Sequence, residues 1–135
     1  MSKYLDTAIE LRAVTEVHYN CAQAVLVPFA KDAGLTPEQA YRIAANLGAG
    51  MKRGSACGAI VGGLLVLGLF GADDPAIVSA YHRKLREAHE GALDCAELLR
   101  INKEHHGEKK PHCDNMVYEC VTLAEQILRE QGKLS

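Results

Sequence analysis

One uncharged segment limits the folds that are open to this chain. From Ser55 to Ala72 no residue carries a charge, and glycine, alanine, leucine and valine make up most of the segment. Its apolar part is too short and too interrupted by glycine to favour a membrane span, which needs about 20 apolar residues. We therefore expect a buried central helix that the other helices surround. With no Trp and two Phe, the core must be aliphatic, which suits closely packed helices.

Capping signals predict further helices around this segment. Thr36-Pro37-Glu38-Gln39 combines an N-cap, a proline at the first helical position and a capping-box glutamine, and Asp74-Pro75 repeats the first two signals. No segment alternates with period two. The predicted helices cover residues 6–19, 21–33 with a kink or division at Pro28, 37–47, 55–71, 75–90, 95–101 and 111–131; residues 48–54 and 102–112 are predicted loops. The fold class is all-α, a single domain over residues 1–135 with about five helices around the Gly/Ala-rich central apolar helix.

Charge and cysteine count restrict the partners and the compartment. The net charge is −2 with mixed signs along the chain, so no clustered basic face predicts nucleic-acid binding. We expect no secretory signal, no membrane association and a cytoplasmic protein with reduced thiols. Five cysteines are too few, and odd in number, for a disulfide scaffold, which favours metal binding or catalysis. A homodimer that covers leftover apolar surface of the central helix is a further expectation.

The placement of the cysteines carries the chemical information. Four of them fall in the predicted first turn of a helix: Cys21, Cys57, Cys95 and Cys113. Unpaired N–H groups and the helix dipole favour the thiolate there, and the thiolate is the form that attacks disulfides and binds metals. Cys120 lies within a helix and is predicted to be a core thiol. No Cys-x-x-Cys pair is present, so the local signature of thioredoxins, zinc knuckles and bacterial ferredoxins is missing, and no c-type haem is expected.

Two histidines and one glycine-rich loop are secondary candidates. His18 precedes Cys21 by three residues and His112 adjoins Cys113, so either could join thiolates around a metal. The other four histidines lie among charges and are predicted to be solvated. The loop from Gly48 to Gly54 matches neither phosphate-loop fingerprint. Lys52 and Arg53 in this loop could hold an anion, but the plainer interpretation is that the glycines let the loop pass close to packed helices.

The ordered motifs resemble a known family. The motifs are Asn20-Cys21-Ala22-Gln23-Ala24-Val25, Gly48-Ala49-Gly50-Met51-Lys52-Arg53-Gly54, Cys57-Gly58-Ala59-Ile60-Val61-Gly62-Gly63, Asp94-Cys95-Ala96-Glu97-Leu98-Leu99 and Cys113. Over about residues 19–128 this order is similar to the C-GCAxxG-C-C family of redox-active proteins. The third motif places Cys before Gly, the opposite order to the family's name, so the resemblance rests on the ordered set.

The resemblance implies a site but no defined reaction. The family cysteines would correspond to Cys21, Cys57, Cys95 and Cys113, with Cys120 as an extra. A related domain occurs in split-Soret cytochrome c beside an iron–sulfur centre. The resemblance therefore implies a cysteine cluster that binds an iron–sulfur cluster or another metal ion, or one that cycles between dithiol and disulfide.

Three hypotheses remain open from the sequence. In the first, the four cysteines ligate a metal or iron–sulfur cluster for electron transfer to a partner that the sequence does not identify. In the second, one close cysteine pair with one thiol of lowered pKa performs thiol–disulfide chemistry. In the third, the chain is a helical binding or assembly module whose cysteines are core residues. The sequence shows no hydrolytic triad or carboxylate pair.

Overall fold

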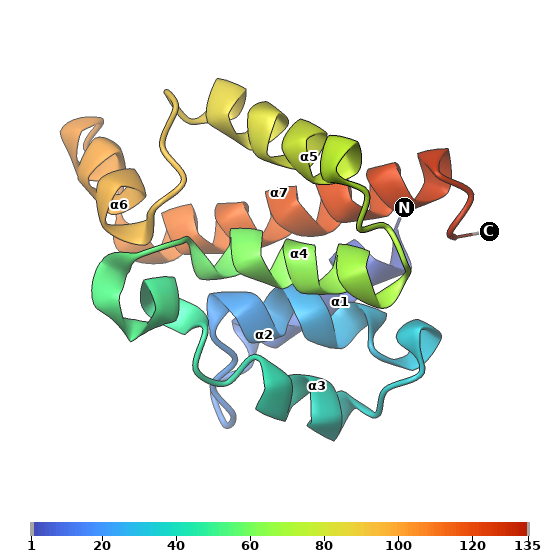
Figure 1. The fold of residues 1–135 in the computed structure, drawn as a ribbon. Coiled ribbons are helices and arrows are strands. Elements are labelled where there is room, and N and C mark those ends of the chain that lie inside the picture. Colours follow the sequence, from blue (N-terminus) through green and yellow to red (C-terminus); the bar gives the residue numbers. More distant parts are fainter. Residues whose placement is uncertain (1, 135) are drawn as a thin grey trace.

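The computed structural model describes residues 2–134, which form an all-α bundle (Figure 1). Within these residues there are seven α-helices, of which five have ten or more residues and two, α2 and α3, are shorter. Their bounds are α1 Lys3–Ala13, α2 Cys21–Leu26, α3 Pro37–Ile43, α4 Gly58–Leu69, α5 Pro75–Ala88, α6 Cys95–Glu104 and α7 Lys109–Glu130. The predicted all-α class is confirmed.

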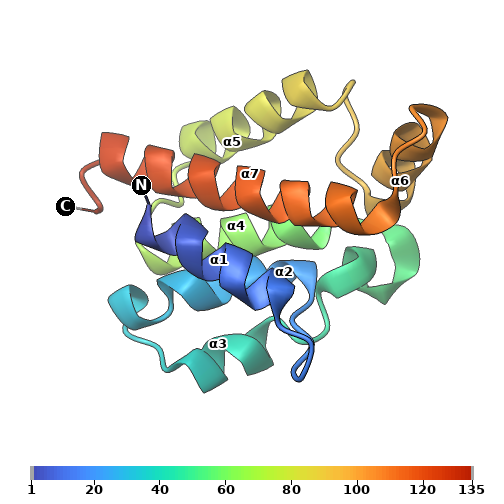
Figure 2. The same ribbon diagram turned by 180° about the vertical axis from the view of Figure 1, so that it is seen from behind.

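The apolar segment forms α4, which lies in the middle of the bundle. It packs mainly against α2 and α7, while α1 crosses α7 and α2 on the other side (Figures 1 and 2). A Cβ at Gly62 would lie 2.9 Å from Val25 Cβ and 3.0 Å from the Ala22 carbonyl oxygen, so glycine permits this close approach of α2. The predicted central helix is therefore confirmed. Within residues 2–134, no helix combines the length and apolar character needed to cross a membrane.

Two predicted helix starts, those at Pro37 and Pro75, are confirmed by their hydrogen bonds. Thr36 accepts from the Gln39 backbone N–H while the Gln39 side chain accepts from the Thr36 N–H, which completes a capping box. Asp74 accepts from the Ala76 N–H at 2.8 Å. The segment predicted over 21–33 is divided around Pro28, since α2 is followed by 3-10 turns at Val27–Phe29 and Lys31–Ala33. Proline has no N–H with which to continue the α-helical ladder.

Some predicted boundaries are wrong. The helix expected over 6–19 is α1, which begins at Lys3 and ends at Ala13. Val14 and Val17 are exposed, so a longer helix would have had no buried face to stabilise it. Similarly, α3 ends at Ile43 rather than near residue 47.

The prediction of a loop over residues 102–112 is also wrong, because α6 continues to Glu104 and α7 begins at Lys109. The Asn102 side chain donates to the Glu108 carbonyl at 3.0 Å and helps to close a short connection. As a result Cys113 lies in the second turn of α7 and not at its start.

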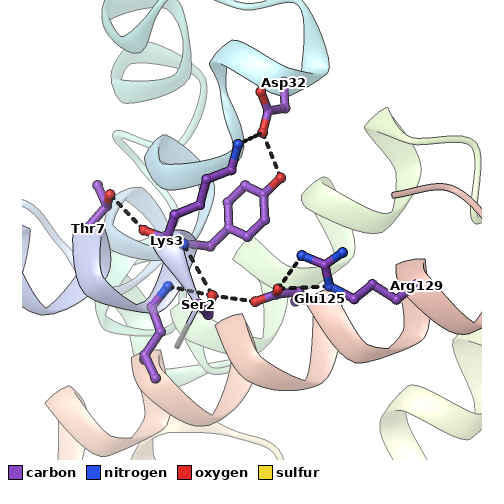
Figure 3. A network of polar contacts seen from close by, with 8 residues as sticks. Ser2, Lys3, Thr7, Asp32, Glu125 and Arg129 are labelled. Atoms are coloured by element: carbon purple, nitrogen blue, oxygen red, sulfur yellow. Dashed lines mark hydrogen bonds and ion pairs between the residues drawn. The ribbon is translucent and has the colours of Figure 1, made fainter. Parts of the chain in front are cut away.

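A polar network fixes the beginning of α1 (Figure 3). The Ser2 hydroxyl caps the N–H groups of residues 4 and 5 and donates to Glu125 of α7, which in turn accepts from Arg129. The Tyr4 hydroxyl donates to Asp32 at 2.6 Å. These contacts hold α1 against α7 and against the 3-10 turn at residues 31–33, and α1 carries Arg12 toward the cysteines.

Candidate redox site

A cavity of about 650 Å³ brings together the four cysteines that the sequence singled out. Cys21, Cys57, Cys95 and Cys113 all line it, although they come from four different helices or helix starts. Cys120 is not among the lining residues and is fully buried in α7. The prediction that Cys120 is a core thiol is confirmed.

Local structure positions each cysteine. Cys21 is the first residue of α2, after the Asn20–Gln23 capping box, and Cys57 is the N-cap residue of α4. Cys95 is the first residue of α6, although the preceding aspartate makes no side-chain cap. Three of the four thiols therefore do lie at helix starts. Cys113 is the exception, as described above.

Backbone contacts join the starts of α4 and α6. Ala56 and Asp94 form an isolated antiparallel bridge. Beside it the Cys57 N–H donates to the Leu93 carbonyl at 3.0 Å and the Cys95 N–H donates to the Ser55 carbonyl at 2.6 Å. This bridge holds Cys57 and Cys95 on the same wall of the cavity.

Close packing around Cys21 requires glycine. A Cβ at Gly58 would lie 2.9 Å from the Leu47 carbonyl oxygen and 3.3 Å from Cys21 Cβ, and one at Gly48 would overlap the Asn20 side chain. The glycine-rich loop therefore passes tightly against α2 and the start of α4, as predicted. This packing places the loop in the cavity wall.

The same loop contains non-glycine residues in the left-handed region. Ala49, Met51 and Lys52 have φ values of 52°, 59° and 62°, a conformation that costs roughly 1–2 kcal/mol per non-glycine residue. Lys52 lines the cavity, and its Nζ donates to Asn46 Oδ1 at 2.9 Å. The surrounding packing must offset this strain.

Cys21 and Cys113 are neighbours in the cavity wall, and the ionisation of each affects the other. The interaction with the Cys21 thiol is the largest cause that lowers the pKa of Cys113 to about 6. Burial opposes the shift, while the positive charges of Arg12 and Lys109 add to it. The pKa of Cys21 is raised by its interaction with Cys113 and by its burial. The two positive charges beside Cys113 thus favour the thiolate there, while burial disfavours ionisation of Cys21.

The other two thiols behave differently. The backbone N–H groups of residues 59 and 60 face the Cys57 sulfur and favour its thiolate. Burial is the larger effect, so the pKa of Cys57 is raised. Burial likewise raises the pKa of Cys95, and the nearby Cys113 adds to the effect. A helix-start position therefore does not by itself lower these pKa values, contrary to the expectation from sequence, because desolvation opposes the charged form.

The cationic groups beside Cys113 were not predicted from the sequence. Arg12 comes from α1, and its Nε lies 2.7 Å from Asp114 Oδ1 while Nη1 donates to the Tyr19 carbonyl at 3.0 Å. Lys109 lies one helical turn before Cys113 in α7, a spacing that places two side chains on one helix face. Only the packing of α1 against α7 reveals Arg12 as part of the site, whereas an i, i+4 pattern could have indicated Lys109.

The histidine predictions have mixed outcomes. His18 and His112 both line the cavity, His18 exposed and His112 half-buried with a pKa lowered mainly by burial. His89 and His105 instead contact carboxylates of Glu119 and Glu90. Within residues 2–134 no group of three or more His, Cys, Asp or Glu side chains is close enough together to hold one metal ion. The structure thus gathers the four cysteines around one cavity without arranging three of them as ligands of a single ion.

Comparison with known proteins agrees with the motif order. No curated protein and no solved structure matches the chain. The model of one family, described as "Putative redox-active protein (C_GCAxxG_C_C)", matches residues 19–127, which is most of the chain. The resemblance seen in the cysteine and glycine motifs is therefore confirmed, and the protein belongs to the C_GCAxxG_C_C family.

Proposed function

We propose that the protein performs thiol–disulfide exchange, with Cys113 as the nucleophile and Cys21 as the resolving thiol. The observation that carries this proposal is that Cys21 and Cys113 line one cavity together with Arg12 and Lys109, whose positive charges stabilise the Cys113 thiolate. Thiolate is the reactive form in disulfide exchange, and a pKa close to ambient pH favours the attacking thiol. This arrangement also places the resolving thiol next to the sulfur that it must attack.

The exchange proceeds in two balanced steps. The Cys113 thiolate attacks one sulfur of a substrate disulfide, a Cys113–substrate bond forms, and the substrate's other half leaves as a thiolate. Cys21 then loses its proton and attacks the Cys113 sulfur, which releases the second half of the substrate. The substrate disulfide is reduced to two thiols and the protein dithiol is oxidised to a Cys21–Cys113 disulfide. The reverse sequence oxidises a substrate dithiol.

Arg12 and Lys109 contribute by holding negative charge on Cys113 in the resting state. Both positive charges favour its thiolate, and their attraction is stronger in a partly buried cavity than in bulk water. The high pKa of Cys21 keeps a proton on the resolving sulfur until the first step has removed the charge from Cys113. A reducing compartment such as the cytoplasm would return the pair to the dithiol state between reactions.

Metal or iron–sulfur binding for electron transfer is a second candidate. The observation that favours it is that four thiols line one cavity, since thiolates are the preferred ligands of zinc and of iron–sulfur clusters. The arrangement fits a dithiol better, because no three ligating side chains within residues 2–134 are grouped for one ion. Elemental analysis for iron and zinc, on protein purified without oxygen, separates the two candidates.

A trapping experiment tests the proposed exchange. With Cys21→Ser the reaction with a small disulfide should stop at a stable mixed disulfide on Cys113, which intact-mass and peptide mass spectrometry detect. Cys113→Ser should abolish the adduct at this site, and Cys120→Ser should behave as wild type because that thiol is buried away from the cavity. An adduct that forms equally well on Cys57 or Cys95 in the Cys113→Ser protein would overturn the assignment.

A further inference from the structure

The surroundings of Cys113 are positively charged although the chain as a whole is acidic. A second hollow of about 360 Å³ shares four lining residues with the main cavity: Arg12, His18, Lys109 and Cys113. Lys52 lines the main cavity and Lys110 the second hollow. The chain has 17 Asp and Glu residues, but among the residues that line these two hollows there is none. A wall of this composition attracts anions and repels cations.

Two of these cations form no ion pair with a carboxylate in the described part of the chain. Arg12 and Lys110 both contact Asp114, so much of their charge is compensated. Among the residues that the structure describes, the polar contact of Lys52 is with the neutral amide oxygen of Asn46. Within residues 2–134, Lys109 makes no ion pair with a carboxylate, and its positive charge acts to lower the pKa of the thiols of Cys113 and Cys95. Lys52 and Lys109 therefore remain available to bind a negatively charged ligand.

The main cavity also has the size and the apolar surface of a small-molecule site. Its volume of about 650 Å³ lies within the range of roughly 300–1,000 Å³ that small ligands occupy. Leu98, Leu99 and Met116 line it together with the cysteines. A ligand suited to this cavity has an apolar or sulfur-containing centre and negatively charged ends.

We propose that the cavity selects small anionic disulfides, compounds whose sulfur–sulfur bond is flanked by carboxylates, and that Lys52 and Lys109 bind these carboxylates. This inference rests on the proposed exchange at Cys113 and names its substrate class. A disulfide with carboxylates is repelled by a thiolate in solution, and the two lysines offset that repulsion as the sulfur approaches. The bonds formed and broken are those already given, with the anionic disulfide as the oxidant and two anionic thiols as products.

Three disulfides of one skeleton and different charge test the proposal. They are dithiodiglycolate, which is anionic, hydroxyethyl disulfide, which is neutral, and cystamine, which is cationic. Rates of thiol release are measured at low ionic strength and divided by the rates of the same compounds with dithiothreitol, which removes their intrinsic reactivity. We expect the normalised rate for dithiodiglycolate to exceed that for hydroxyethyl disulfide by about tenfold or more, with cystamine slowest. Added salt should reduce the preference.

The lysine variants identify the source of the preference. In the double variant Lys52→Gln with Lys109→Gln, the ratio of anionic to neutral rate should fall to near the dithiothreitol reference. This ratio is the informative quantity, because the loss of Lys109 also makes Cys113 less reactive toward every disulfide and that effect cancels. Lys84→Gln, on the exposed side of α5, is the matched control and should keep the wild-type ratio. An unchanged ratio in the double variant would overturn the role of the two lysines.

A non-exchanging ligand separates this inference from the proposed function. Thiodipropionate is a dicarboxylate with a thioether in place of the disulfide, so it can bind but cannot react. Its binding to the Cys113→Ser protein, seen as amide NMR shifts at Lys52 and Lys109, supports anion selection whether or not exchange occurs. If the three disulfides react equally after normalisation and thiodipropionate shifts no amides in the cavity, the inference is wrong while the exchange stands. If no disulfide reacts, the exchange is wrong and the thiodipropionate result decides anion binding.

Discussion

The Arg12 guanidinium lies 2.7 Å from the Asp114 carboxylate, directly beside Cys113 in α7. Both side chains are largely buried, with 11% and 18% of their surface exposed. Burial opposes ionisation of Asp114, but the hydrogen bonds from Arg12 and Lys110 hold its pKa below the usual value. One ion pair thus fastens α1 to α7 and delivers a cation to the nucleophile.

The two partners of this pair should have opposite effects on Cys113. Arg12→Met removes a positive charge that lowers the pKa of Cys113, and Asp114→Asn removes a negative charge that raises it. We expect the pKa of Cys113 to rise in the first variant and to fall in the second, measured from the pH dependence of its alkylation. Both variants should lose about 1–3 kcal/mol of unfolding free energy in urea titrations. Asp114→Asn leaves the partly buried Arg12 without its carboxylate, and Arg12→Met leaves Asp114 with Lys110 as its remaining cation. Shifts of the same sign would contradict this account.

The Cys21 thiol should control the pH profile of Cys113. In wild type, the rate of Cys113 alkylation by iodoacetamide should reach half its maximum at about pH 6. The rate should be close to its maximum by pH 7.5. In Cys21→Ala the main cause of the lowered pKa is absent, so the midpoint should move toward about 8.5. A thiol with that pKa is ionised to only about 3% at pH 7. Site-resolved mass spectrometry measures the rates. An unchanged midpoint in Cys21→Ala would show that Cys21 is not the cause of the lowered pKa.

The same group makes stability depend on pH. The pKa of Cys113 is lower in the folded protein than the ordinary thiol pKa. Its ionisation therefore stabilises the fold fully at pH values above the ordinary thiol pKa, and this contribution is lost as pH falls toward 6. In Cys113→Ala this dependence should be absent between about pH 6 and 8.5. Urea titrations of both proteins across this window provide the test, and parallel curves would argue against a lowered pKa.

Close contact between α2 and α4 should appear as opposite effects of two Gly→Ala changes. By helix propensity alone, alanine is favoured over glycine by about 0.5–1 kcal/mol. At Gly68, where a Cβ meets nothing within 4 Å, Gly68→Ala should stabilise by that amount. Gly62→Ala forces Cβ against Val25 and the Ala22 carbonyl and should destabilise by about 1–3 kcal/mol. Thermal or urea unfolding measures both, and stabilisation by Gly62→Ala would disprove the tight approach.

The hydrogen bond from Tyr4 to Asp32 should be visible at high pH. Burial and Asp32 raise the pKa of Tyr4 to about 12, above the unfolded value of about 10. The contribution to stability is therefore complete below pH 10 and is lost as pH rises toward 12. Tyr4→Phe should be less stable by about 1 kcal/mol at pH 7, and the difference from wild type should shrink above pH 10. A difference that stays constant to pH 11.5 would exclude this linkage.

Much of the fold could be predicted from the sequence because its signals are local. Three such signals depend on residues within one or two helical turns, and the structure confirms all three. They are the capping box at Thr36, the proline after Asp74 and the glycine-rich apolar segment. The helix-start positions of Cys21, Cys57 and Cys95 were local signals of the same kind. Boundaries failed where packing decided them, as at the exposed Val14, where α1 has no packed face on which to continue.

Only the tertiary structure decided which thiol is reactive. The sequence alone grouped four cysteines by motif, but it could not show that Cys21 and Cys113 are neighbours or that Arg12 of α1 lies beside them. Their pKa values follow from burial and from neighbours on other helices, and these effects outweigh the helix-start position of Cys57 and Cys95. Capping depends on backbone geometry within a single turn, whereas desolvation and charge depend on atoms that are distant in sequence and meet only when α1, α2 and α7 pack together.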